Sequence, residues 1–535
     1  MKKKIIIFFS ILMFIICFLI ISLENNSNLS STANAANFQQ SYNLKIANVR
    51  GNIYDCNFVS MVNKKKKIVA SIIPSIETLN KISEVMPENK NINLLEIFSG
   101  NMPFILEITK KVKSKDIECF EIPIRYSGIT RASHIIGYLS GDQKGVSGIE
   151  KSFDEYLHDK DDDINIKYIR TASNKLLMGG KNNIKNKNYK YSKGVVLNID
   201  SKIQNIVEEV AGKYISDGVV IISEVPNCEI RAWASLPNFQ PQNVAEYLSD
   251  KKSPLLNKGL CQFDLGSIFK LVTAATALEN NINGNVSFEC KGAYKVENHN
   301  FRCYNGVPHG VTNMEKAIAY SCNGYFIKIT ENIDPNLLLE MSRKFGLGKS
   351  INLAPCINSA EGILPENIEK TNKKLTANIS FGQGKLSVSP IQVVGLINSI
   401  ASDGKYSVPK LVKGLVDSGL NFVLQNENEE SEQIISSQTA EKLKKYMNSS
   451  IEFGTSKRGK PTKVTALAKT STAQTGMIKD GEKVIQSWFA GSIPYENPKY
   501  NIVILSEDTL SGGGGKTCGP VFSEIADKIY SLKQF

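Results

Sequence analysis

The longest hydrophobic stretch of the chain lies at its N-terminus. Three lysines precede an uncharged run from Ile5 to Leu23, which is 19 residues long. A helix of that length crosses about 30 Å of hydrocarbon, and the basic flank predicts a cytoplasmic N-terminus. A cleaved signal peptide is the alternative, with Ala33-Asn34-Ala35 as its cleavage site. We favour a retained single-pass anchor at 1–23, and both interpretations place the rest of the chain outside the cytoplasm.

The pattern beyond the anchor divides the chain into three further parts. Residues 24–45 are rich in Asn and Ser, which predicts a flexible tether. From 46 to 193, short apolar runs alternate with polar turns and end in a polar stretch. This pattern predicts a mixed α/β domain with a C-terminal linker. From residue 194 onwards the hydrophobic periodicity is stronger, and we expect one large domain from 194 to 535.

Hydrophobic periodicity within 194–535 predicts strands at both ends of this domain. A helix is expected from about Lys202 to Ile215, capped by Asp200 or Ser201. Asp480-Gly481 is a turn signal between two strand patterns. Three sequential strands followed by an amphipathic helix predict an antiparallel sheet with a helix packed against it. The strands are expected at 219–222, 230–234, 463–474, 484–493 and 500–507, and the last helix at 521–532.

Composition narrows the class of protein. The 535 residues are 42% hydrophobic and 22% charged, which excludes a largely disordered chain. Lys and Arg number 64 and Asp and Glu 52, so the formal net charge is +12 and favours an anionic partner. No recognisable nucleic-acid-binding motif occurs. An anionic membrane surface or cell-wall polymer is therefore the better partner, and we expect no nucleic acid.

The first candidate for chemistry is Ser267-Ile268-Phe269-Lys270, which fits S-x-x-K. Two other matches occur, but only Ser267 opens an apolar helical pattern, from Leu265 to Leu278. At i and i+3 of a helix, Ser267 and Lys270 share one face. A serine hydroxyl needs a base, and a lysine with a lowered pKa can serve as that base. A solvated lysine at an ordinary helix start is the alternative.

Two further boxes follow in order along the chain. Ser321-Cys322-Asn323 fits S-x-N, in which a hydroxyl relays a proton and an amide orients a peptide; a helix-capping pair is the alternative. Lys469-Thr470-Ser471 lies in a predicted strand, where it is suited to bind a carboxylate. The edge of such a strand pairs with an extended peptide. An ordinary edge-strand lysine is the alternative for this third box.

The three boxes together resemble S-x-x-K, S-D-N and K-T-G of penicillin-binding proteins and class A β-lactamases. The chain resembles a class B penicillin-binding protein, a membrane-anchored peptidoglycan D,D-transpeptidase. The resemblance implies an α+β transpeptidase domain of the serine β-lactamase type, with an antiparallel sheet flanked by helices plus an all-helical part. It makes 46–193 a non-catalytic pedestal or dimerisation-like domain. Further matching segments are Arg50–Asp55, His134–Tyr138, Gly145–Glu150, Asn257, Phe381–Gly384, Ser389–Gln392 and Trp488–Gly491.

The resemblance also implies a mechanism. Ser267 attacks the carbonyl of a D-Ala-D-Ala stem peptide with Lys270 as base, while Ser321 protonates the departing D-Ala and Asn323 orients the substrate. Lys469, Thr470 and Ser471 belong to the carboxylate-binding strand, and the backbone N–H groups of Ser267 and Thr472 form the oxyanion hole. β-Lactams are expected to acylate the same serine. No cofactor and no metal are implied, and a membrane-embedded glycan-strand polymerase is the expected partner.

The chain departs from the family pattern at several positions, among them Cys56 and Phe58, which replace the usual Arg and Gly after Asp55. Leu265 stands where the family has Pro, and Ala468 and Ser471 stand where glycines flank the lysine and threonine. Serine in place of glycine adds a hydroxymethyl group that is expected to narrow the site or alter β-lactam affinity. The alternatives are a D,D-carboxypeptidase or β-lactamase-like hydrolase, and a cell-wall scaffold with impaired catalysis.

Two other patterns imitate functional sites. Ser511–Thr517 resembles a phosphate loop, but Leu510 stands where the motif requires glycine. Cys290, His299, Cys303 and His309 are conceivable zinc ligands, but their spacing contains no C-x₂-C pair, so we expect no metal site. A disulfide between Cys290 and Cys303 stays open.

Overall fold

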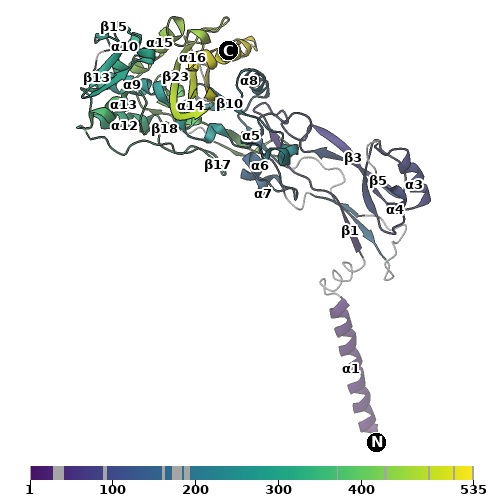
Figure 1. Cartoon of the computed structure of the whole chain (residues 1–535). Coiled ribbons are helices and arrows are strands. Elements are labelled where there is room, and N and C mark those ends of the chain that lie inside the picture. Colours follow the sequence, from purple (N-terminus) through teal and green to yellow (C-terminus); the bar gives the residue numbers. More distant parts are fainter. Residues whose placement is uncertain are drawn as a thin grey trace. The chain divides into compact units, whose positions relative to one another are not determined.

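The computed structural model describes most of the chain, namely residues 2–27, 41–87, 93–158, 163–170, 183–185, 193–282, 284–369, 371–426, 430–479, 482–509 and 513–532. Ala33-Asn34-Ala35 and Asp480-Gly481 lie outside these ranges, as do much of the expected tether and of the linker before residue 193. Figure 1 shows the order of the elements along the chain.

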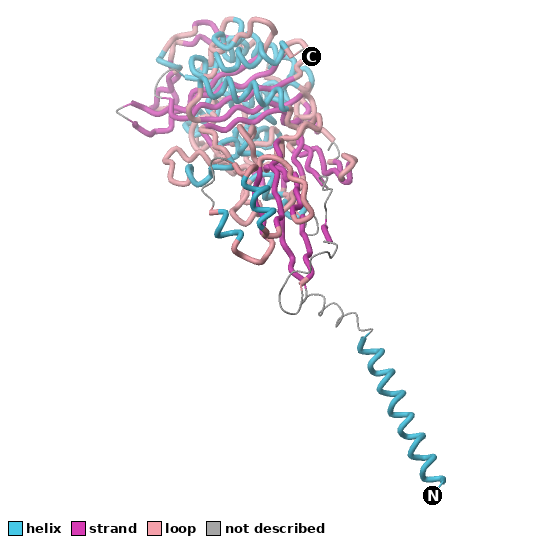
Figure 2. Tube along the Cα trace, turned by 90° about the vertical axis from the view of Figure 1, so that its right-hand side faces the viewer, coloured by secondary structure: helices cyan, strands magenta, loops and turns pink. Residues whose placement is uncertain are grey.

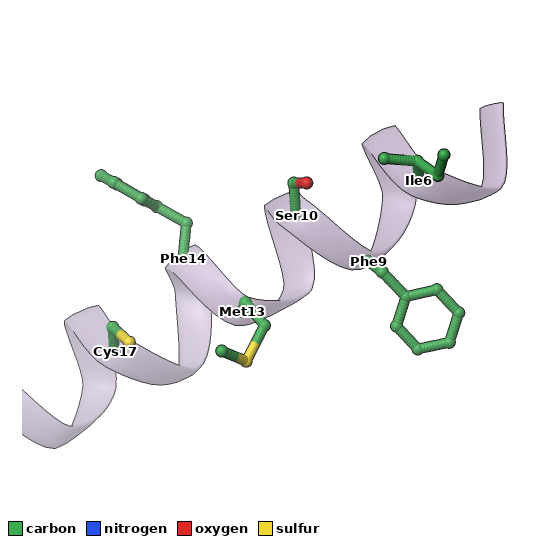
Figure 3. A pocket seen from close by; sticks show the side chains of 6 residues that line it. All are labelled: Ile6, Phe9, Ser10, Met13, Phe14 and Cys17. Carbon is green, nitrogen blue, oxygen red and sulfur yellow. The ribbon is translucent and has the colours of Figure 1, made fainter. Parts of the chain in front are cut away.

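The N-terminal run forms helix α1 (Lys2–Ser27). Within the part of the chain that the structure describes, no helix meets the length and apolarity needed to cross a membrane. Figure 3 shows a pocket whose labelled lining comes from α1 alone and includes no charged side chain. The lining residues are Ile6, Phe9, Ser10, Met13, Phe14 and Cys17.

The chain forms two compact units that are interleaved in sequence. The first comprises residues 1–50, 65–124 and 158–191, and the second comprises 51–64, 125–157 and 192–535. The sequence predicts consecutive domains instead. The interleaving has a direct cause, because β2 (Asn52–Tyr54) pairs in parallel with β8 (Lys193–Leu197), so that a segment early in the chain joins the second unit.

The first unit is a mixed α/β structure built on two small antiparallel sheets. In one sheet β3 (Lys65–Ile72) lies between β4 (Phe104–Ile108) and β5 (Ile117–Ile124). The other has the order β1-β6-β7. One apolar cluster is shared by the two sheets: Val69 of β3 packs with Ile164 and Ile166 of β6. A second cluster covers the other face of the first sheet, where Ala70 of β3 packs with Ile82. The remaining elements are β1 (Ser41–Ala47), β6 (Ile164–Ile169), β7 (Asn183–Lys185), α3 (Ile76–Ser83) and α4 (Leu94–Phe98).

A five-stranded antiparallel sheet of order β10-β9-β25-β24-β23 organises the second unit. The three strands predicted at the C-terminal end are confirmed as neighbours in this sheet. Strand β23 lies at its edge, with β24 on one side. The bounds are β9 (Gly218–Glu224), β10 (Glu229–Leu236), β23 (Leu467–Lys479), β24 (Glu482–Ile493) and β25 (Tyr500–Thr509).

Helices cover both faces of this sheet (Figure 2). Val220 and Ile222 pack on one face against α8 (Ser201–Tyr214) and α17 (Gly519–Ser531). Val219 and Ile221 point to the opposite face. There they belong to the same apolar cluster as residues of α9 (Lys270–Glu279) and α14 (Pro390–Ala401). Because successive strand residues alternate between faces, β9 is apolar at every position from 219 to 222. The Asp200 side chain accepts from the N–H groups of Lys202 and Ile203, which confirms the predicted cap of α8.

The all-helical part and its small hairpins lie beyond the second face. These elements are η4 (Gly266–Phe269), β12 (Phe288–Cys290), β13 (Ala293–Val296), β14 (His299–Arg302), η5 (Tyr304–Gly306), β15 (Gly310–Thr312), α10 (Met314–Ala319), α11 (Asn323–Thr330), α12 (Pro335–Lys344), α13 (Lys373–Ser380), α15 (Ser437–Glu452) and α16 (Gly513–Thr517). Other short elements of the unit include α5 (Ser133–Ile136), α6 (Gly148–Ser152), β20 (Val412–Asp417) and β21 (Phe422–Gln425). The second unit thus has the predicted α+β composition.

Candidate active site

Ser267 lies at the entrance to the central helix of the second unit. It belongs to η4, which runs directly into α9, and its side chain is partly exposed. Lys270, one turn later, is fully buried. The Nζ atom of Lys270 lies 3.0 Å from Ser267 Oγ, so the predicted pairing of the two residues on one face is confirmed. Leu265, which replaces the family's proline, is buried immediately before this turn.

The second box lies in the turn between α10 and α11 and meets Lys270 from the other side. Lys270 Nζ lies 2.7 Å from the Ser321 carbonyl oxygen and 3.0 Å from Ser321 Oγ. It also lies 2.6 Å from Asn323 Oδ1. The Asn323 amide in turn donates to the carbonyl of Arg302 at 2.8 Å. A single buried nitrogen therefore connects the first two boxes.

Ser321 is held in a backbone conformation that serine rarely adopts. Its φ is +57°, in the left-handed region, which costs a non-glycine residue roughly 1–2 kcal/mol. Such a conformation persists where the surroundings fix it. Here the carbonyl and the hydroxyl of Ser321 are both tied to Lys270. The strained backbone of Ser321 is thus held in place by its contacts with Lys270.

Strand β23 brings the third box to the same hydroxyl. Lys469 Nζ lies 3.0 Å from Ser321 Oγ and donates to the Thr470 carbonyl at 2.8 Å. The neighbouring side chains are also anchored. The Thr470 hydroxyl donates to Thr455 Oγ1 at 2.8 Å, and the N–H of Gly514 donates to Thr472 Oγ1 at 3.2 Å. All three boxes predicted from the sequence thus converge on Ser321.

Burial lowers the pKa of both lysines. Desolvation lowers the pKa of Lys270 to about 8, against the attraction of the nearby Cys322 and Cys303 sulfurs, which acts in the opposite direction. Desolvation and then repulsion from Lys270 hold the pKa of Lys469 well below its ordinary value. Two ammonium groups sharing one hydroxyl oxygen in a buried site repel each other strongly. The pair therefore titrates as a unit, and a neutral amine next to Ser267 is accessible near neutral pH.

Ser471, which stands where the family has glycine, fits beside η4, the turn that contains Ser267. The Ser471 side chain is 2% exposed, and its Oγ has no hydrogen-bond partner among the described residues. It occupies the space next to Gly266, where an added Cβ would come within 2.4 Å of it. The hydroxymethyl group therefore fills a gap between β23 and η4, and its effect on β-lactam affinity stays a prediction.

The structure adds residues to the site that the sequence does not identify by chemistry. Gly382, inside the Phe381–Gly384 segment, has φ +84°, and a Cβ there would lie 1.9 Å from the Gly266 carbonyl oxygen. Thr455 enters as the partner of Thr470. Neither role can be predicted from the sequence. Gly382 is required by a close approach of two backbone segments, and Thr455 by a contact between distant segments, and neither kind of contact produces a sequence motif.

Comparison with known proteins places this site in a family. Residues 218–527, from the first residue of β9 into α17, match the penicillin binding protein transpeptidase domain. Stage V sporulation protein D of Bacillus subtilis (strain 168) is 26% identical over 521 residues, covering 91% of this chain and 78% of that protein. Peptidoglycan D,D-transpeptidase FtsI of Escherichia coli (strain K12) is 23% identical over 492 residues, covering 88% of this chain and 78% of that protein.

Solved structures show the same fold. A penicillin-binding protein, PBP2, in complex with MreC from Helicobacter pylori superposes with a TM-score of 0.68 at 22% identity, covering 92% of this chain and all of that one. Penicillin binding protein 3 from Mycobacterium tuberculosis, complexed with aztreonam, gives 0.66 at 19% identity over 92% of this chain and 97% of that one. The fold and the matched domain define a serine acyl-enzyme transpeptidase. The chain belongs to the penicillin-binding protein transpeptidase family.

Proposed function

We infer that this chain is a peptidoglycan D,D-transpeptidase that crosslinks stem peptides through a serine acyl-enzyme. One observation supports this best. Lys270 Nζ lies within 3.0 Å of Ser267 Oγ, Ser321 Oγ and Asn323 Oδ1, in a site where burial lowers its pKa. This arrangement supports roles for Ser267 as nucleophile, Lys270 as base and Ser321 as proton relay.

In the proposed acylation step, neutral Lys270 takes the proton of the Ser267 hydroxyl. Ser267 Oγ then attacks the carbonyl of the penultimate D-Ala, and the carbonyl oxygen becomes an oxyanion. The backbone N–H groups of Ser267 and Thr472 are proposed to stabilise it, and one such donor contributes about 2.7–4 kcal/mol in the transition state. Collapse breaks the peptide bond, and the proton held by Lys270 passes through the Ser321 hydroxyl to the departing D-Ala nitrogen.

Strand β23 is proposed to hold the substrate. Among the described strands, none pairs with the outer edge of β23, and an extended stem peptide would add there as a further strand. Lys469, Thr470, Ser471 and Thr472 form the stretch of strand beside the nucleophile, and the terminal carboxylate would bind there. An incoming carboxylate also favours the charged form of Lys469. An amine from a neighbouring stem peptide then attacks the acyl-enzyme, which forms the crosslink and releases Ser267.

The sequence and the relatives support a proposal for the cellular setting. We propose that Ile5–Leu23 anchors the chain in the cell membrane, with the catalytic unit outside the cytoplasm. We further propose that 46–193 acts as a non-catalytic pedestal, with 194–535 as the transpeptidase domain, and that a membrane glycan-strand polymerase supplies the glycan. The Helicobacter pylori structure is a complex of PBP2 with MreC, which supports a protein partner for this chain as well.

Labelling with a fluorescent penicillin tests the assignment. Wild-type chain should label once, at Ser267, and Ser267→Ala should not label. Ser249→Ala is the matched control, because Ser249 opens a second S-x-x-K match in an exposed loop. Persistent one-to-one labelling of Ser267→Ala would sink the assignment. Incubation with a stem-peptide donor, with and without an amine acceptor, then separates a transpeptidase from a hydrolase, and failure of the wild type to acylate would indicate a scaffold.

A further inference from the structure

Three cysteines and one histidine converge beside the Ser321–Asn323 turn. Cys290 ends β12, Cys303 follows β14, His309 precedes β15, and Cys322 is the central residue of the second box. We call these four residues the Cys3His cluster. Their four ligand atoms all lie within 4.8 Å of one another, and the three cysteines are buried. The sequence spacing argues against a metal site, but the fold brings in Cys322, which that spacing does not suggest.

Three separations within the cluster match those of a tetrahedral metal site. The Sγ atoms of Cys290 and Cys303 are 3.7 Å apart, and those of Cys303 and Cys322 are 3.9 Å apart. Cys290 Sγ lies 3.4 Å from His309 Nδ1. Tetrahedral zinc with Zn–S of about 2.3 Å and Zn–N of about 2.0–2.1 Å requires S···S separations of about 3.8 Å and S···N separations of about 3.5 Å.

A disulfide does not account for this arrangement. All three cysteines are free thiols in the structure, and a disulfide requires sulfurs about 2.05 Å apart. A bridge between Cys290 and Cys303, which the sequence left open, would also use only two of the four groups. The third thiol and the imidazole would remain buried or half-buried beside it without a role.

Neighbouring groups fix the orientation of the cluster. The N–H of Tyr325 donates to Cys322 Sγ at 3.5 Å, and the backbone of Asn323 and Gly324 is hydrogen-bonded to the Cys303 sulfur. The His309 ring stacks on Tyr320, with ring centroids 6.0 Å apart and planes 15° apart. Hydrogen bonds to ligand sulfurs and a fixed imidazole are the outer-shell contacts that orient metal ligands.

We propose that the Cys3His cluster binds one Zn²⁺ as a structural site. Thiolates and imidazole suit zinc, whereas magnesium and calcium require oxygen ligands. Four protein ligands leave no open position for water, so the ion would not take part in the chemistry. Binding deprotonates three thiols and releases their protons to solvent, while the imidazole binds as the neutral ring. Three thiolates and one Zn²⁺ give the filled site a net charge of −1.

The ion would tie the small hairpins of 288–312 to the second box. Cys322 stands between Ser321, whose backbone is strained, and Asn323, which contacts the Arg302 carbonyl. A bond from Cys322 to zinc would thus hold both catalytic neighbours in place. This positioning effect rests on the proposed function, whereas the metal site itself does not.

Metal content of the full chain, purified under reducing conditions with ZnSO₄ supplied during growth, tests the proposal. Wild type should contain about one zinc per chain, and His309→Gln and Cys322→Ser should each contain less than about a tenth of that. His299→Gln and Cys518→Ser are matched controls, because His299 lies near the cluster in sequence and Cys518 is a buried cysteine outside it. Both controls should keep their zinc.

Cobalt replacement of the wild type gives a readout that does not depend on the stability of any variant. Co²⁺ added to the zinc-depleted chain should produce the intense thiolate-to-cobalt absorption of a tetrahedral site. A reduced, folded wild type that takes up neither zinc nor Co²⁺ would overturn the proposal, as would unchanged zinc in both cluster variants. A disulfide within the cluster, mapped in the chain isolated from cells, would also overturn it. None of these readouts needs activity, so a failure of penicillin labelling would count against the proposed function alone.

Discussion

Replacing Asn323 by Asp tests whether Lys270 is the base. The change is almost isosteric, and it places a carboxylate where the amide oxygen lies 2.6 Å from Lys270 Nζ. A negative charge next to the ammonium form stabilises that form. The substitution should therefore raise the pKa of Lys270 and move the pH dependence of acylation upwards, while the side chain keeps its shape.

The size of the effect follows from the ionisation of Lys270. With a pKa of about 8, roughly one tenth of the chains carry a neutral lysine at pH 7. An opposite charge at this distance raises a pKa by about 1 to 3 pH units. At pH 7 the neutral fraction, and with it the acylation rate, should fall about tenfold to a thousandfold. Raising the pH should restore much of the loss, because the lysine then becomes neutral again.

Stopped-flow acylation by a chromogenic β-lactam between pH 6 and 10.5 measures this shift. Wild type should gain rate as the pH rises and level off above about 8, the pKa of Lys270. The midpoint belongs to the pair of buried lysines rather than to one of them. Asn323→Ala is the control: it removes an acceptor from the ammonium form, so its midpoint should stay or fall. An Asn323→Asp midpoint equal to that of wild type would refute Lys270 as the rate-setting base.

Three further predictions concern packing. Gly382→Ala should lower the free energy of unfolding and slow acylation, because the new Cβ would lie 1.9 Å from a backbone oxygen. Gly384→Ala is the control in thermal unfolding: it also has a positive φ, but its nearest atom is 3.6 Å away, so it should lower the free energy of unfolding by only about 1 kcal/mol. Ser471→Ala should raise the free energy of unfolding by about 1–3 kcal/mol in denaturant titrations, since it removes a buried hydroxyl without a partner; a loss would show that the hydroxyl is satisfied. Arg125→Met should destabilise by about 3–5 kcal/mol, because Arg125 pairs with buried Glu150 at 2.6 Å, and Arg125→Lys should recover part of the loss.

Much of the catalytic unit is readable from local sequence. The helix after Asp200 and the last three strands follow from caps and alternation, and the structure has each of them. The three boxes are also found, because each contains adjacent residues on one helix, turn or strand. The convergence of the three boxes on Ser321, in contrast, cannot be predicted from local sequence. It depends on the packing of α9, α11 and β23, and only the order of the boxes hints at it.

Features that need long-range pairing escape sequence reasoning. The parallel pairing of β2 with β8 interleaves the two units, although composition suggests consecutive domains. Cys322 joins Cys290 and His309 through the packing of small hairpins, so spacing rules for zinc ligands miss it. The role of Gly382 depends on the backbone of another segment. In each case the contacting residue or strand lies far away in the sequence, so no local sequence pattern predicts the contact.

The position of β25 in the sheet has a consequence for how the chain is made. β25 lies between β9 and β24, so β9 and β10 leave the ribosome long before the strand that completes their sheet, which begins only at Tyr500. Until then, the apolar edge of β9 has no native neighbour, and such edges promote aggregation. Lys469 lies in β23, which begins only at Leu467 and is therefore also made late. A nascent chain that ends before β23 therefore lacks the third box of the site, and a chain that ends before Tyr500 leaves the edge of β9 without its native neighbour.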